Sequence, residues 1–245
     1  ITSTDLNQTI DIIVGGLGVG QEVKLNGLNI TNSGVNYPLV SVFSGIDNLI
    51  FSNNTFDLTD AAVNNQSAID FADDNTSRDN HLFYNNTFNL TSSNNAIDYG
   101  TTNTNVSSNI YLWKNTFTFT PTNSLTDVAV RLGSVSNNLE VLGNSFLGGG
   151  LYLGKDASDY TNVKIGNAGN HPTYNFPQGN TFSQVSEPYT YDIRLENNGG
   201  TGVIANAGTF SVKQNNFEFV KFAVSFDATI ADADIDFNNI FVNQN

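Results

Sequence analysis

The chain has 245 residues, of which 39% are hydrophobic and 13% charged, and its formal net charge at pH 7 is −14. Its nine Lys and Arg residues are too few for the basic surface that nucleic-acid binding requires, and the acidic balance also disfavours acidic polysaccharides as substrates. No apolar run reaches the roughly 18 residues of a membrane-spanning segment. The absence of cysteine gives no evidence for or against an oxidising compartment.

Residues 1–22 are predicted to hold a first strand, at residues 9–14, followed by a Gly-rich bend. The chain begins with Ile1 rather than Met, so we expect a processed or excised product whose signal peptide has been removed. Such a product is expected outside the cell or on its surface.

A short motif, Asn followed by Thr or Ser and then Phe, recurs along the chain at intervals of roughly 25 to 35 residues, which is typical of a solenoid. The clear copies are Asn54-Thr55-Phe56, Asn86-Thr87-Phe88, Asn115-Thr116-Phe117, Asn144-Ser145-Phe146 and Asn180-Thr181-Phe182. Three looser copies are predicted at Asn26-Gly27-Leu28, Asn215-Asn216-Phe217 and Asn239-Ile240-Phe241.

Each copy lies in the same context of three strand-length pieces. An apolar run such as residues 49–51 precedes the motif, and alternating pieces such as residues 56–59 and 68–71 follow it. Pieces with period-2 alternation, separated by Asn, Gly and Asp turn residues, predict strands, and no window shows the apolar stripe of a helix. Three strands make one coil, and about eight coils fit the chain. Stacked at about 4.8 Å, they would form a rod roughly 40 Å long.

The recurring motif, with its asparagines at turns, resembles the repeats of the pectin-lyase-like superfamily. In its Asn-rich and Lys-poor composition the chain is most similar to prokaryotic adhesin-like surface repeat proteins. The resemblance implies an all-β fold, a right-handed parallel β-helix (solenoid) of about eight three-strand coils. It says little about activity, because this fold serves lyases, glycosidases, tailspikes and adhesins alike. We expect one domain over 1–245, with regular coils at 23–148, a coil with an inserted loop at 149–189 and final coils at 190–245.

Both ends of the predicted solenoid lack an evident cap. An uncovered coil presents unpaired backbone groups, so we expect self-association of coils end to end into a filament, sheath or lattice. The alternatives are that residues 1–8 or the inserted loop at 167–178 cover an end, or that a neighbouring domain is missing. Loops that project from solenoids often carry binding, so the inserted loop is also a candidate contact.

One outward row of the predicted strands carries charged side chains, at Asp70, Asp98, Arg131 and Arg194. In enzymes that the chain resembles, the active groove follows such a face, which would make Asp70 and Asp98 an acid/base pair of a polysaccharide lyase or glycosidase. The alternative, which we favour, is a ladder in which Arg131 offsets two stacked carboxylates, because the His-Gly and Arg-x-Lys elements of galacturonase-like enzymes are absent. We therefore expect no enzyme activity and no catalytic residue.

Three alternating carboxylates in the last coil, Asp232, Asp234 and Asp236, could face one side and hold Ca²⁺. No other metal or cofactor is expected.

Three rings, Tyr84, Tyr111 and Trp113, are predicted to point outward if Phe83 and Leu112 point inward. Such rings form either a sugar-stacking platform or a subunit contact, and we favour contact because no polar cluster accompanies them in the sequence. A strand parity wrong by one residue would instead bury them.

Asn-x-Ser/Thr sequons, which are candidate glycosylation sites in an exported protein, occur only in the first half of the chain. They begin at Asn7, Asn29, Asn53, Asn65, Asn75, Asn85, Asn89 and Asn105. The sequence as a whole predicts a non-enzymatic, extracellular structural or adhesive protein, with glycans as candidate partners. The competing function is a carbohydrate-active enzyme or a tailspike-like glycan binder.

Overall fold

A computed structural model gives the fold of the chain. It describes residues 2–3, 10–12, 21–32, 38–42, 46–59, 66–71, 78–91, 94–100, 107–120, 128–133, 135–154, 161–183, 193–196, 203–204, 210–218, 224–227, 229–230, 233–236 and 238–241. These residues form strands, turns and bends, and no helix of a length and apolarity that could cross a membrane occurs among them.

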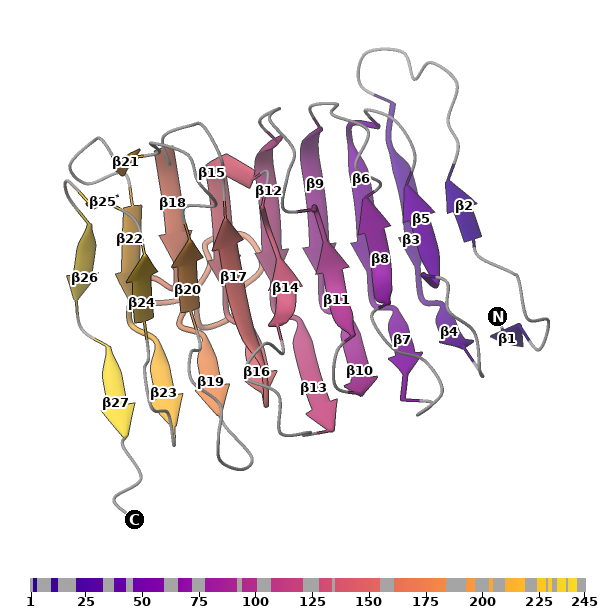
Figure 1. The fold of residues 1–245 in the computed structure, drawn as a ribbon. Coiled ribbons are helices and arrows are strands. Elements are labelled where there is room, and N and C mark those ends of the chain that lie inside the picture. Colours follow the sequence, from indigo (N-terminus) through magenta and orange to yellow (C-terminus); the bar gives the residue numbers. More distant parts are fainter. Residues whose placement is uncertain are drawn as a thin grey trace.

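The described strands assemble into three large parallel sheets that wind into a right-handed β-helix, as predicted. Figure 1 shows the coils following one another from the indigo N-terminal end to the yellow C-terminal end. Sheet A contains β1 (Thr2–Ser3), β4 (Asn29–Asn32), β7 (Thr55–Leu58), β10 (Thr87–Thr91), β13 (Thr116–Thr120), β16 (Ser145–Leu147), β19 (Thr181–Ser183), β23 (Asn216–Glu218) and β27 (Asn239–Phe241).

Sheet B contains β2 (Ile10–Ile12), β5 (Val40–Val42), β8 (Ser67–Phe71), β11 (Asn95–Asp98), β14 (Val128–Arg131), β17 (Gly150–Gly154), β20 (Ile193–Glu196) and β24 (Val224–Asp227). Sheet C contains β3 (Val23–Asn26), β6 (Leu49–Ser52), β9 (Asp79–Tyr84), β12 (Ser107–Trp113), β15 (Val135–Leu142), β18 (Thr161–Ile165), β22 (Phe210–Lys213) and β26 (Asp234–Asp236). A small parallel pair joins β21 (Val203–Ile204) to β25 (Thr229–Ile230).

A buried ladder of asparagine side chains forms the corner between sheets C and A. At Asn115, Oδ1 accepts hydrogen bonds from the backbone N and Nδ2 of Asn86, each 3.0 Å away. Its own Nδ2 donates to the carbonyl of Phe83 and to Oδ1 of Asn144. Each amide thus joins its coil to the coils on both sides, which explains why the motif requires Asn. The ladder comprises Asn54, Asn86, Asn115, Asn144, Asn180, Asn215 and Asn238.

The residue before five of the ladder positions takes left-handed backbone angles. Asn53 has φ 56°, Asn85 has φ 54° and Gly143 has φ 65°. Among L-residues Asn tolerates this region best, and Gly adopts it freely. The Asn-Asn pairs of the sequence therefore combine a turn residue with a ladder residue.

Inside the helix, the motif phenylalanines stack from coil to coil. Ring centroids lie 4.8 Å apart between Phe56 and Phe88, 5.1 Å between Phe88 and Phe117, and 4.7 Å between Phe117 and Phe146. The column continues through Phe182 to Phe217, and all of these rings are fully buried. Strand pairing and ring stacking therefore favour the same register between neighbouring coils.

The predicted motif copies at the two ends are out of register. In the first coil Ile30 pairs with Phe56 and the backbone N of Leu28 donates to Oδ1 of Asn54, so the motif lies at residues 28–30 and not at 26–28. In the last coil Ile240 pairs with Phe217, so the copy is residues 238–240 and not 239–241. Leu28 replaces the ladder Asn, and Ile240 replaces the column Phe.

Candidate functional site

The three predicted outward rings lie on the outer face of sheet C. Tyr84, Tyr111 and Trp113 are half-buried, whereas Phe83 and Leu112 between them are fully buried. The strand parity assumed from the alternation is therefore confirmed. The binding role of the rings remains a prediction.

The inserted loop, residues 167–178, interrupts the corner between β18 and β19 and folds back over earlier coils. At its base the carbonyl of Gln178 accepts a hydrogen bond of 3.0 Å from the backbone N of Gly143. The ring of Phe176 is buried against the same glycine, and a Cβ there would lie 2.5 Å from a ring carbon. Gly143 thus allows both the left-handed turn and the close approach of the loop.

The tip of the loop packs against the outward rings. The His171 ring lies 4.5 Å from Trp113 and stacks on Phe176 at 5.0 Å, while Tyr174 lies 4.9 Å from Tyr84 and 5.5 Å from Trp113. Nδ1 of His171 accepts hydrogen bonds from two backbone N–H groups of the loop, at 3.2 and 3.3 Å. The imidazole therefore carries its proton on Nε2 and holds the tip of the loop in shape.

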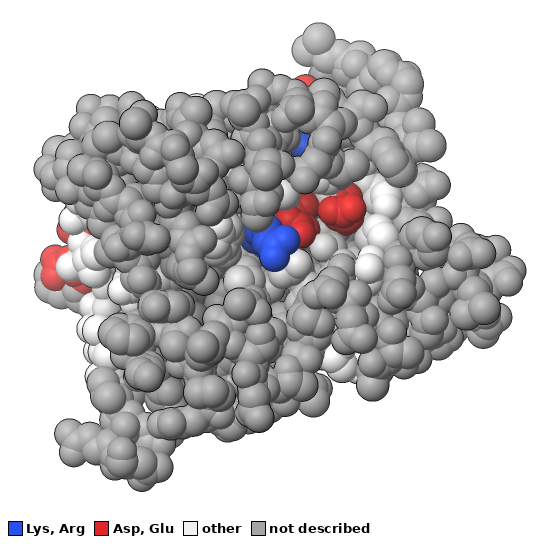
Figure 2. All heavy atoms as spheres, viewed as in Figure 1, with Lys and Arg blue, Asp and Glu red and all other residues white. Residues whose placement is uncertain are grey.

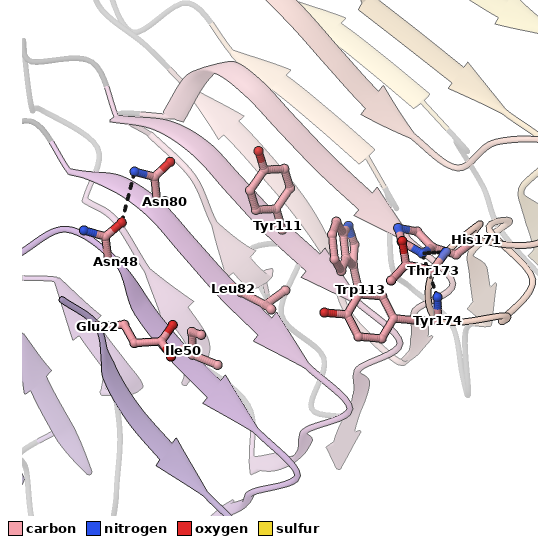
Figure 3. A pocket seen from close by; sticks show the side chains of 10 residues that line it. All are labelled: Glu22, Asn48, Ile50, Asn80, Leu82, Tyr111, Trp113, His171, Thr173 and Tyr174. Atoms are coloured by element: carbon pink, nitrogen blue, oxygen red, sulfur yellow. Dashed lines mark hydrogen bonds between the residues drawn. The ribbon is translucent and has the colours of Figure 1, made fainter. Parts of the chain in front are cut away.

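Together the loop and sheet C enclose a groove of about 430 Å³, which we call the aromatic groove. Figure 3 shows Trp113, His171, Thr173 and Tyr174 gathered at one end. Leu82 lies in the middle. The remaining lining side chains are Tyr111, Ile50, Glu22, Asn48 and Asn80. Volumes of roughly 300–1,000 Å³ with a mainly apolar lining and a few polar groups are usual for small-ligand sites.

The aromatic groove carries one formal charge, at Glu22, which lies away from the rings. The pKa of the Tyr111 phenol is raised, first by burial and then by the neighbouring Glu140 carboxylate. Lys164, which forms a 3.0 Å ion pair with Glu140, partly opposes this effect. The phenol therefore stays protonated at neutral pH and remains a hydrogen-bond donor.

A row of exposed and half-buried amides, which the sequence analysis missed, passes along the start of the sheet C strands. Nδ2 of Asn80 donates to Oδ1 of Asn48 at 3.2 Å, and the row continues further along the rod from Asn109 to Asn138 and Asn162. All five have positive φ, between 51° and 64°. Each immediately precedes an inward residue, as in Asn48-Leu49 and Asn80-His81. An Asn directly before an inward residue is therefore the sequence pattern that could have predicted this row.

The predicted charged row on sheet B is also brought together. Strand pairing places its members on successive coils in the order Asp70, Asp98, Arg131, Tyr152 and Arg194. Figure 2 shows acidic and basic side chains side by side on this face. Nη1 of Arg131 lies 3.1 Å from Oδ2 of Asp98, whose Oδ1 accepts a 2.7 Å bond from the backbone N of Gly100. Arg131 thus forms an ion pair with Asp98, one of the two stacked carboxylates.

Two of the three predicted Ca²⁺ residues lie in the described part of the chain. Asp234 forms an ion pair with Lys213, and Asp236 is exposed. Asp232 lies outside the described residues, among which no group of three metal-ligating side chains occurs.

Four of the eight sequon asparagines lie in the described part of the chain. Asn29, Asn53 and Asn85 are exposed, and Asn89 is half-buried. Nδ2 of Asn85 donates to Oδ1 of Asn53, and Nδ2 of Asn53 donates to Oδ1 of Asn26, both at 2.8 Å. Asn7, Asn65, Asn75 and Asn105 lie outside the described residues.

A comparison of the chain with protein-family models, curated proteins and solved structures finds no match in any of the three. Its function is therefore inferred from the geometry above.

Proposed function

We propose that the chain is a non-enzymatic structural and adhesive protein of the cell exterior, a rod that stacks end to end with other copies and presents the aromatic groove on its side. The observation that carries the stacking is the last described coil. Ile235 and Ile240 are 46% and 56% exposed, although they continue the buried core positions of Val212 and Phe217. A coil of a second copy placed on β26 and β27 would cover both side chains and pair the strand edges.

An extracellular setting is supported by the surface chemistry. The low content of charged residues, the net charge of −14 and the exposed sequons at Asn29, Asn53 and Asn85 suit an exported protein with attached glycans. The asparagine ladder and three parallel sheets support kinship with the pectin-lyase-like superfamily and with its adhesin-like surface proteins.

The test is sedimentation velocity and electron microscopy of the purified chain at rising concentration. Stacking predicts filaments or linear oligomers for the unaltered chain and single rods for the Ile235→Ser/Ile240→Ser variant. Tyr174→Ser is the matched control, because Tyr174 is also an exposed large hydrophobic residue, at 41%, but lies on the side of the rod. Single rods at every concentration, or filaments that persist in the double variant, would contradict stacking through this coil.

A carbohydrate-active enzyme is the competing function, and the register of Asp70 beside Asp98 is the observation in its favour. We favour a structural role for the Asp98 carboxylate, because it forms an ion pair with Arg131 and accepts a bond from Gly100. Polysaccharide cleavage that is lost in Asp98→Asn would establish the enzyme.

A further inference from the structure

We infer that the aromatic groove is a binding site for uncharged carbohydrate. This inference rests on the adhesive part of the proposed function and is independent of end-to-end stacking. It also revises the expectation of a subunit contact, which depended on the absence of polar groups near the rings.

The structure supplies those polar groups. Glu22, Asn48, Asn80 and Thr173 lie around the same groove as Tyr111 and Trp113. Side-chain amides both donate and accept hydrogen bonds, a carboxylate accepts, and a protonated phenol donates, so the groove offers the mixed partners that vicinal hydroxyl groups require.

The rings supply the second half of sugar recognition. A pyranose has a face of C–H groups that packs on an aromatic ring while its hydroxyl groups point outward along the ring edge. Tyr174 is more than a third exposed and stands beside Trp113 at the end of the groove, so its ring is available to such a face. The apolar floor at Ile50 and Leu82 lies within the same groove.

The negative charge of the groove and of the chain favours uncharged sugars over acidic ones. Among the described residues that line the groove, the single formal charge is negative and none is Lys or Arg. The chain as a whole carries −14, so we expect acidic sugars to be repelled. The volume of about 430 Å³ is small, so we expect a short segment of a glycan to be held rather than a long chain.

The indole of Trp113 adds a further argument. Its N–H group is buried and has no hydrogen-bond acceptor among the described residues. Buried donors without a partner are rare and need an explanation. A slight shift of the loop that admits a ligand oxygen would supply the acceptor.

The experiment uses the single tryptophan of the chain, which reports on the groove alone. The emission of Trp113 is followed while short oligomers of glucose, galactose, mannose and N-acetylglucosamine are added, with oligogalacturonate as the acidic comparison. We expect a saturable change with at least one neutral oligomer and weaker or no binding of oligogalacturonate.

Variants locate the site. Tyr174→Ala removes an exposed ring without disturbing the core and should weaken binding about tenfold, which corresponds to about 1.4 kcal/mol. Asn80→Gly removes one amide but keeps the left-handed backbone, and should also weaken binding. Thr118→Ala is the control that should leave the affinity unchanged, because Thr118 lies in β13 of sheet A and does not line the groove.

Three outcomes would overturn the inference: no response to any neutral oligomer, a response that Tyr174→Ala leaves unchanged, or tighter binding of the acidic oligomer. If sugars fail and Tyr174→Ala instead reduces self-association, the groove is a contact between copies. Stacking through the last coil is judged separately, by the Ile235→Ser/Ile240→Ser variant.

Discussion

Replacing Asn115 by Ala tests whether the asparagine ladder holds the coils together. The substitution leaves the backbone N–H of Asn86 and one amide proton of Asn86 without their acceptor, and the carbonyl of Phe83 loses a donor. The backbone N–H of residue 115 keeps its bond to Asn144. Two buried donors left unsatisfied cost about 1–3 kcal/mol each, so we expect the free energy of unfolding to fall by about 4 kcal/mol.

The assay is urea unfolding followed by far-ultraviolet circular dichroism, with Asn54→Ala as the matched control. Oδ1 of Asn54 accepts a bond from the backbone N of Leu28 only, because Leu28 has no amide to donate a second one. The control should therefore lose about 1–3 kcal/mol less than Asn115→Ala. Equal losses in both variants, or a loss below about 1 kcal/mol for Asn115→Ala, would refute the view that the buried amides stabilise the helix.

Three other substitutions test the core and the loop. Phe117→Ala should cost about 3–5 kcal/mol in urea unfolding because its ring is fully buried in the stack, and a cost below about 1 kcal/mol would contradict that packing. Burial lowers the pKa of His81 from 6.5 to about 4. At pH values between 4 and 6.5 the unfolded chain therefore binds a proton at this residue that the folded chain does not bind. Stability should then fall by about 3 kcal/mol as the pH drops from 6.5 to 4, relative to His81→Leu, and parallel pH profiles would contradict this. Gly143→Ala should displace Phe176 and change the emission of Trp113 while the far-ultraviolet spectrum stays the same, and unchanged emission would argue against the loop packing.

The architecture could be predicted because stacking forces the sequence to repeat. Each ladder Asn and each column Phe contacts its own copy in the next coil, so Asn86, Asn115 and Phe117 recur in a fixed relation that a reader can count. The prediction failed at the two end coils. In the first coil Leu28 and Ile30 replace the ladder Asn and the column Phe, and in the last coil Ile240 replaces the column Phe. With Leu28 at the ladder position and Ile240 in the Phe column, neighbouring residues fit the motif equally well, and only strand pairing fixes the register.

The aromatic groove could be predicted only in part. Alternation with Phe83 and Leu112 placed the rings of Tyr84, Tyr111 and Trp113 outside, because period 2 is all that orientation in a strand requires. The inserted loop has no period, so nothing in its sequence shows that it folds back over three coils. The contact between Tyr174 and Tyr84 joins residues far apart in sequence and appears only in the folded chain.

The outer rows of a β-helix carry information that the inner columns cannot. Inward positions are mostly apolar whatever the protein does, whereas an outward position is free to be polar. Along the middle row of sheet C, Lys24 is followed by Ile50, Leu82 and Tyr111, and then by the paired Glu140 and Lys164. Ile50, Leu82 and Tyr111 point outward and do not pack in the interior. Large, partly exposed side chains on adjacent coils are unfavourable unless they are covered. They coincide with the place where the loop supplies rings and the amide row supplies hydrogen-bonding groups. The coincidence of these three independent elements on one face supports our inference that the aromatic groove binds a ligand.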